Sequence, residues 1–148
     1  LTAMTDVILE SEGTLDKYVG DEIVALFHDD QPELAACASA LAIQEELARN
    51  RENLYGGLHV GIGINYGEVI LGMIGSEKRA DYTVIGDNVN TASRLCDVAR
   101  EGQTIISASL YEKVKDRITT QGPYKVRVKG KKDYIRVYLL KSLKGKAT

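Results

Sequence analysis

The chain has 148 residues, the size of one ordinary domain, and its 44% hydrophobic and 27% charged residues are typical of a globular protein. A net charge of −2 at pH 7 gives no overall basic field, which argues against nucleic acid as a partner. The longest apolar runs, such as residues 69–71, are far too short to cross a bilayer, and no signal peptide is recognisable, so we expect no membrane contact from this segment.

The first half of the chain is predicted to contain two helices separated by a hairpin. In chain order we expect a helix, two strands and a long alanine-rich helix over residues 1–12, 14–19, 22–27 and 32–50. Gly13 stops the first helix, and Pro32 opens the second. Gly20-Asp21 between the strands is a two-residue hairpin signal in which glycine supplies the unusual backbone angle.

The second half is predicted to be richer in strands. In chain order we expect two strands, a helix, a strand, a short helix and a closing hairpin over residues 58–65, 69–74, 86–100, 104–107, 108–115, 124–128 and 134–140. The strand at 69–74 is the expected antiparallel partner of 58–65. Residues 142–148 are expected to form a basic, flexible tail. This order predicts an α+β fold with a ferredoxin-like βαββαβ palm core and helices on one sheet, whose first strand is missing from this chain.

The two cysteines, Cys37 and Cys96, lie far apart and form no CxxC pattern. Both fall in segments predicted to be helical. We therefore expect reduced core thiols and a cytoplasmic location, rather than a disulfide or a metal site.

Asp21 is a candidate metal ligand. A carboxylate at the tip of a hairpin is held by two strands and can point into a cleft. Mg²⁺ and Mn²⁺ prefer carboxylate oxygens together with substrate phosphates, so one or two such carboxylates can make a metal site. Taken alone, Gly20-Asp21 is better explained as simply a favourable turn.

The helix expected at 86–100 carries a second candidate group. Its apolar residues recur at the helical period along one side, at Val89, Ala92, Leu95, Cys96 and Ala99. Asn90 and Arg94 lie one turn apart on the opposite side. An amide and a guanidinium placed together can hold a ribose oxygen and a phosphate in fixed geometry. A solvated helix face is the alternative interpretation of the same pair.

Two glycine-containing segments are weaker signals. Lys129 and Gly130 lie in a lysine-rich turn that suits phosphate binding and suits an exposed hairpin equally well. Residues 61–67 have glycines at alternate positions, but these fall within a predicted strand and not between a strand and a helix, as a dinucleotide-binding loop requires. We interpret them as allowing a helix to pack closely on the sheet.

Together these segments resemble the class III nucleotidyl cyclases, the family of adenylyl and guanylyl cyclase catalytic domains, and most closely its bacterial-type adenylyl cyclases. The matching stretches occur in family order and cover nearly the whole chain, at residues 13–21, 61–69, 81–95 and 126–130. The resemblance implies a catalytic domain over residues 1–141 that converts ATP into 3′,5′-cyclic AMP and pyrophosphate with two Mg²⁺ or Mn²⁺ ions.

The resemblance also implies roles for individual residues around the purine and the metal. Asp21 matches the second of two metal-binding aspartates. Lys17 matches the lysine that recognises the adenine ring, a position where guanylyl cyclases typically carry Glu. Thr83 matches the second purine-recognition position, where many adenylyl cyclases have Asp and a bacterial-type branch has Thr.

Four further residues match positions that contact the ribose and the phosphates. Asn90 matches the residue that orients the ribose, and Arg94 matches the arginine that stabilises the pentavalent phosphorus. Lys129 matches the lysine that holds the terminal phosphates. Arg79 is a further expected phosphate contact. The implied chemistry is coherent, because phosphoryl transfer depends mainly on positioning and on stabilising developing charge.

In this family the active site forms between two catalytic domains, and this chain carries residues from both halves of such a site. The resemblance therefore implies a head-to-tail homodimer with two equivalent sites. The family's first metal aspartate lies on a strand upstream of the first helix, and we find no substitute in residues 1–12. Because Leu1 is not a methionine, we interpret the start of the chain as an internal cut. Without that aspartate, the chain is expected to be a poor or inactive catalyst.

Three alternatives remain open. The first is a guanylyl cyclase, against which Lys17 argues. The second is a diguanylate cyclase or polymerase-like palm, which has no need of Asn90 and Arg94 on one helix. The third is a degenerate cyclase-like domain that binds nucleotide or a partner without turnover, against which the retained site residues argue.

Overall fold

The computed structural model describes residues 2–54, 57–74, 81–130 and 132–145 of the chain. Its helices and strands are α1 (Thr2–Glu10), β1 (Thr14–Val19), β2 (Glu22–Leu26), α2 (Pro32–Leu54), β3 (Ile62–Ile64), β4 (Ile70–Ile74), β5 (Asp81–Ile85), α3 (Asp87–Val98), β6 (Thr104–Ser107), α4 (Ala108–Val114), β7 (Ile118–Val126) and β8 (Ile135–Leu143). The expected mixture of helices and mainly antiparallel strands is therefore confirmed.

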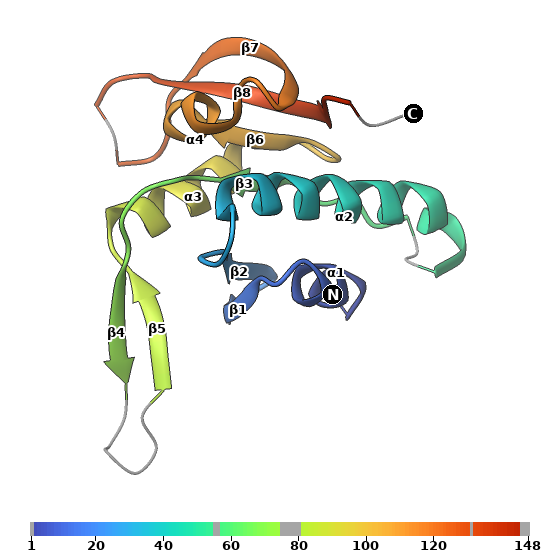
Figure 1. Cartoon of the computed structure of the whole chain (residues 1–148), viewed down its shortest axis with the longest axis horizontal. Coiled ribbons are helices and arrows are strands. Elements are labelled where there is room, and N and C mark those ends of the chain that lie inside the picture. The colour runs from blue at the N-terminus through green and yellow to red at the C-terminus, as the bar shows by residue number, and fades with distance from the viewer. Residues whose placement is uncertain (1, 55–56, 75–80, 131, 146–148) are drawn as a thin grey trace.

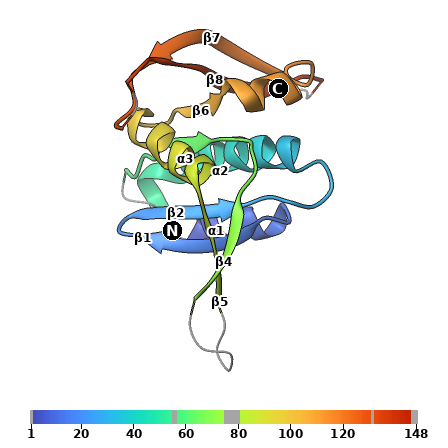
Figure 2. The same cartoon turned by 90° about the vertical axis from the view of Figure 1, so that its left-hand side faces the viewer.

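The described strands form three separate sheets. A two-stranded sheet pairs β1 with β2, a second pairs β4 with β5, and a four-stranded sheet has the order β3-β6-β8-β7. Helix α2 lies between the β1–β2 hairpin with α1 on one side and the strands β6, β7 and β8 on the other (Figures 1 and 2). The fold thus brings the first hairpin, α3 and the central sheet around one long helix.

Apolar side chains bury on both sides of α2. On one side Ile43 and Leu47 pack with Ile8 of α1 and with the first hairpin. On the other side Cys37 of α2 packs with buried residues of α4, β6, β7 and β8, and Cys37 and Ile106 of β6 are both 0% exposed. Helix α2 is covered on two faces. It therefore carries alanines where a surface helix would have a wide polar face. The helix bends at Asn50 (φ −119°, ψ 15°), where its end was predicted, and continues to Leu54.

The predicted pairing of residues 69–74 with 58–65 is wrong. Strand β4 pairs antiparallel with β5, and β3 pairs parallel with β6. The expected turn does not reverse the chain, because the side chain of Asn88 packs against Gly67 and donates a hydrogen bond to the Glu68 carbonyl at 2.8 Å. The chain therefore leaves the body at this point, and the β4–β5 hairpin projects as an arm (Figure 1).

The last strands extend further than predicted. Strand β7 begins at Ile118 and β8 ends at Leu143, so β8 enters the segment 142–148 that the sequence assigns to a tail. The Lys144 amide also donates to the Arg117 carbonyl at 2.9 Å. Residues 146–148 lie outside the described part of the chain.

A large groove separates β2 from β3. Each of these strands is the last of its sheet, so each has an edge without a strand partner among the described residues. The groove has a volume of about 800 Å³, and residues of β2, β3, α2 and α3 line it. Ser39 of α2 lines it too; its hydroxyl is buried and makes no hydrogen bond within the described structure.

Candidate active site

Asp21 lies at the tip of the β1–β2 hairpin. Val19 and Glu22 pair across the turn, and Gly20 has a φ of 61°, the left-handed conformation that glycine adopts without strain. The Asp21 side chain is exposed and lines the large groove. An exposed carboxylate on a rigid turn fits a divalent metal that takes its other oxygens from phosphates. No group of three or more His, Cys, Asp or Glu side chains is arranged as a metal site within the described ranges.

Glu22, the next residue, is tied to α3. The hydroxyl of Ser93 lies 3.1 Å from each of its carboxylate oxygens and donates to this carboxylate. No sequence pattern indicates this pair, because the two residues are 71 positions apart. The contact fixes the Asp21 hairpin relative to the helix that carries Asn90 and Arg94.

Lys17 lies on β1 and reaches β5. Its ammonium donates to the Val84 carbonyl at 3.0 Å and lies 3.3 Å from the Asp16 carboxylate. The same carboxylate accepts a hydrogen bond from the Val84 amide at 3.0 Å. Lys17 is therefore held beside the residue that follows Thr83, so the two predicted purine-recognition positions lie close together on neighbouring strands.

The remaining purine and phosphate candidates are placed only in part. Thr83 lies on β5, where its backbone pairs with Gly72 of β4. Arg79, the predicted additional phosphate contact, lies outside the described residues.

Asn90 and Arg94 lie on α3, whose opposite side is buried. Leu95 is 0% exposed and packs with Ile105 and Val137, and Ala99 packs against the same cluster. The predicted apolar stripe therefore faces the sheet. Asn90 is exposed and Arg94 half-buried, so both present polar groups away from the core.

Gly63 of β3 and Gly61 just before this strand allow α3 to approach closely. A β carbon at Gly63 would meet the backbone nitrogen of Cys96 and lie 2.6 Å from the Ala92 carbonyl oxygen. A β carbon at Gly61 would lie 2.9 Å from the Ala99 carbonyl oxygen. The packing role predicted for the alternating glycines is thus confirmed, and it sets the distance between α3 and the sheet.

Arg94 also contacts the turn between β7 and β8. A β carbon at Gly130 would lie 3.2 Å from Arg94 Nη2, and Gly130 has a φ of 86°. Val128, only 1% exposed, anchors this turn, and Lys129 between them is exposed. The fold therefore brings the guanidinium of Arg94 next to Gly130, the residue that follows Lys129.

Both thiols are free in the described structure, as expected. Burial raises the pKa of Cys37 to about 12. Burial, followed by the nearby charge of Glu22, raises the pKa of Cys96 to about 11. Thiols with such high pKa values are protonated near neutral pH and act as small apolar groups and not as nucleophiles.

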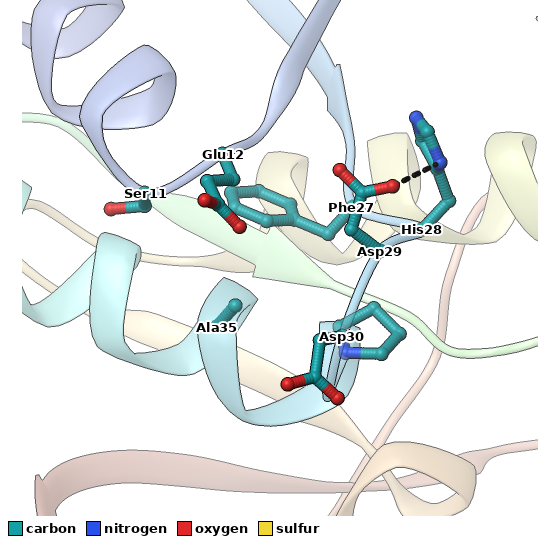
Figure 3. Close-up of a pocket in the computed structure, with 8 residues that line it drawn as sticks. Ser11, Glu12, Phe27, His28, Asp29, Asp30 and Ala35 are labelled. Carbon is teal, nitrogen blue, oxygen red and sulfur yellow. Dashed lines mark ion pairs between the residues drawn. The ribbon is translucent and has the colours of Figure 1, made fainter.

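A second, small hollow lies at the far end of the first hairpin (Figure 3). Its lining includes Glu12, Asp30 and Asp29, and His28 Nδ1 lies 3.2 Å from Asp29 Oδ1. Its volume of about 10 Å³ is that of about one water molecule. It contains none of the residues that the sequence assigned to a site.

Comparison with known proteins gives a consistent result. The family described as adenylate and guanylate cyclase catalytic domain matches residues 10–142. An adenylate cyclase of Anabaena cylindrica is 34% identical over 158 residues, which cover 96% of this chain and 31% of that protein. The chain thus spans about a third or less of the curated relatives it matches first.

Solved structures that share this fold include both an adenylyl cyclase and a guanylyl cyclase. The adenylyl cyclase CyaB from P. aeruginosa has a TM-score of 0.83 and 30% identity, covering 95% of this chain and 78% of that one. The guanylyl cyclase Cya2 has a TM-score of 0.86 and 35% identity, covering 96% and 76%. Among the described residues, no helix is both long and apolar enough to span a membrane.

Proposed function

This chain belongs to the family of adenylate and guanylate cyclase catalytic domains, and we propose that it is an adenylyl cyclase domain that converts ATP into 3′,5′-cyclic AMP and pyrophosphate. The observation that carries the choice of ATP is the position of Lys17, whose ammonium is held beside the Thr83–Val84 segment. An ammonium group can only donate hydrogen bonds, and the adenine edge offers ring-nitrogen acceptors. A hydroxyl at Thr83 can donate or accept, so it is compatible with adenine.

The reaction joins the ribose 3′-oxygen to the α-phosphorus and releases pyrophosphate. Asp21 would hold divalent metal, which supplies charge neutralisation at the phosphates and a lower pKa at the 3′-hydroxyl. Asn90 would orient the ribose through its side-chain amide. Arg94 would act on the charge that develops on the equatorial oxygens of phosphorus, and Lys129 would hold the terminal phosphates. The contact between Arg94 and the turn at Gly130 supports a shared phosphate surface.

We propose a head-to-tail homodimer in which each site uses residues of both copies. The arm formed by β4 and β5 supports this arrangement, because its apolar side chains are exposed in the single chain. Ile70 is 64% exposed, Leu71 60% and Ile85 46%. Large apolar side chains gathered on a projecting hairpin mark an interaction surface, and a second copy of the same chain would cover them in a closed symmetric pair.

A second metal carboxylate is proposed to arrive on a strand that precedes Leu1. The groove between β2 and β3 has two sheet edges and an apolar lining, which suit an added strand. A strand there would run next to the hairpin that carries Asp21. On this proposal residues 1–141 belong to the catalytic domain, which works in the cytoplasm. Residues 142–148 form a tail, except that the first of them still belong to β8.

The test is product formation from ATP and from GTP, measured side by side with Mn²⁺. It uses residues 1–148 and a longer protein that includes the residues upstream of Leu1. Cyclic AMP as the main product supports the proposal, and a gain of activity in the longer protein supports the added strand. Equal activity of the two proteins would overturn the proposal that an upstream strand completes the site.

A guanylyl cyclase is the second candidate, favoured by the similarity to Cya2 at 35% identity. Cyclic GMP as the main product would overturn the choice of ATP and keep the fold and the mechanism. Tight nucleotide binding without either product, in the longer protein with its dimer intact, would favour a binding or regulatory domain.

A further inference from the structure

We propose that Asp16 is a positioning residue for purine selectivity: it fixes the direction of the Lys17 ammonium and the backbone at Thr83–Val84. The inference rests on the proposed function, since it concerns how the same site tells adenine from guanine. No motif pointed to Asp16, and its part follows from contacts in the folded chain.

The first observation is a bulge in β1. Leu15 pairs with Ala25 and Lys17 pairs with Val24, so Asp16 is an extra residue in the ladder. Successive side chains of a regular strand point to opposite faces. A bulge breaks this alternation and re-aims a side chain, and bulges are over-represented next to active sites. Here the consequence is that two consecutive side chains, Asp16 and Lys17, both reach Val84.

The second observation is a closed ring of contacts. Asp16 Oδ1 accepts from the Val84 amide at 3.0 Å, and Asp16 Oδ2 lies 3.3 Å from Lys17 Nζ. The ring closes where Lys17 Nζ donates to the Val84 carbonyl at 3.0 Å. The ring therefore holds the peptide groups on both sides of Val84. One of them is the Thr83–Val84 peptide, so the backbone of Thr83 is fixed by the same carboxylate that holds Lys17.

The third observation is burial. The Asp16 side chain is only 6% exposed, whereas that of Lys17 is 33% exposed. A carboxylate is costly to bury unless it is paired and hydrogen-bonded, and removing one partner of such a pair is strongly unfavourable. The shielded carboxylate thus acts as a fixed anchor, and the more exposed ammonium is the end that can meet a purine.

Without the anchor, Lys17 can still donate to the Val84 carbonyl but loses the carboxylate that fixes a second direction of its ammonium. A lysine ammonium sits on a flexible four-carbon stem and carries three rotatable donors. A mobile ammonium would discriminate less well between an adenine acceptor and the guanine edge. The inference therefore predicts lower selectivity, which differs from a general loss of activity.

The variant that tests this is Asp16→Asn. Its amide oxygen can still accept from Val84, but it lacks the charge that holds Lys17. We expect the ratio of kcat/KM for ATP to that for GTP to fall about tenfold, which corresponds to about 1.4 kcal/mol. The matched control is Asp29→Asn, an exposed aspartate in the small hollow, which should leave the ratio unchanged. In a Lys17→Met background, Asp16→Asn should change the ratio no further.

The outcomes separate this inference from the proposed function. If both nucleotides lose activity equally in Asp16→Asn, the residue only supports the fold and the inference is overturned. The same holds if Asp16→Asn lowers the ratio as strongly without Lys17 as with it. If the wild type forms cyclic GMP instead, the proposed function fails, while a changed ratio in Asp16→Asn still supports the positioning role.

Binding gives a readout that does not depend on turnover. Calorimetry with 3′-deoxy-ATP and 3′-deoxy-GTP uses ligands without the attacking hydroxyl. Loss of preference between the two in Asp16→Asn, with wild-type preference in Asp29→Asn, supports the inference. An unchanged preference in Asp16→Asn overturns it.

Discussion

The Ser93 hydroxyl lies 3.1 Å from both carboxylate oxygens of Glu22, which ties the tip of the first hairpin to α3. The residue before Glu22 is the candidate metal ligand, and the residue after Ser93 is the candidate transition-state arginine. One part-buried hydrogen bond therefore joins, within one copy, the two elements that carry these candidate residues.

Removing the Ser93 hydroxyl should weaken the fold measurably. Ser93→Ala leaves the half-buried Glu22 carboxylate without this donor, and hydrogen bonds to charged groups contribute roughly 1.5–3 kcal/mol. We expect the free energy of unfolding in urea to fall by about that amount. A double-mutant cycle with Glu22→Gln should give a coupling energy of about 1 kcal/mol. Additive effects of the two substitutions would show that the contact contributes nothing in solution.

Arg94→Ala should reduce turnover far more than nucleotide binding. Its proposed partner is charge that exists only in the transition state, and losing such a donor typically costs about 10²–10³ in kcat. Steady-state kinetics with ATP and Mn²⁺ check this, with Arg100→Ala, an exposed arginine just beyond α3, as the control. A rise in KM that matches the loss of kcat would assign Arg94 to ground-state binding instead.

The sequence predicted local elements better than it predicted their partners. Strand β1 and strand β6 have the predicted bounds, because the turn at Gly20 and the short apolar run are local signals. The partner of β4 was predicted wrongly, and β5 was not predicted as a strand. A short alternating segment does not encode which strand it pairs with. Here the side chain of Asn88 sets the partner of β4, because it holds the backbone at Gly67 and Glu68.

The same limit applies to the candidate site. Asn90 and Arg94 could be placed together because a helix puts positions four apart on one face. The roles of Asp16, Glu22 and Ser93 could not be found, because their contacts join residues 68 and 71 positions apart. The bulge at Asp16 is also invisible in the residue pattern, since an alternating strand would separate Asp16 from Lys17.

A charge on the projecting arm should break the proposed dimer. Leu71→Asp places a carboxylate where an exposed apolar side chain would be covered by the second copy. We expect the dimer dissociation constant to rise at least about tenfold, because an unpaired charge at an interface costs several kcal/mol. Sedimentation velocity checks this, with Leu9→Asp, 53% exposed on α1, as the control. An unchanged dimer would place the interface elsewhere.

Mixing two inactive variants should restore activity if each site is shared. Asp21→Ala and Arg94→Ala would then damage opposite halves of one site, since the metal ligand and the transition-state arginine of each site would come from different copies. In an equimolar mixture about half of the dimers contain one copy of each, and each of these has one intact site, so about a quarter of wild-type activity is expected. Recovery would support a site between two copies, and no recovery despite mixed dimers would place both residues in one copy's site.

Gly63→Ala should strongly destabilise the packing of α3 on β3. The added methyl group would meet the backbone of Cys96 and Ala92, which cannot move without shifting the helix. Overpacking of this kind typically costs about 1–3 kcal/mol or more. The control is Gly102→Ala, where φ is +78° and nothing lies within 4 Å, so only backbone strain of about 1–2 kcal/mol applies. Thermal and urea unfolding should rank Gly63→Ala as less stable than Gly102→Ala.

The burial of Cys37 should make the fold sensitive to alkaline pH. Burial raises its pKa from 9.0 to about 12, so the folded chain keeps the thiol proton over a range in which the unfolded chain loses it. The stabilisation is complete below pH 9 and is lost as the pH rises from 9 to about 12, at roughly 1.4 kcal/mol per pH unit. Between pH 8 and pH 11, the free energy of unfolding in urea should therefore decline less steeply with pH in Cys37→Ala than in the wild type.

The quantity to compare is the slope of this free energy against pH. The cavity in Cys37→Ala lowers stability at every pH, and the other titrating groups are shared by both proteins. Parallel declines would mean that Cys37 is accessible enough to ionise in the folded chain.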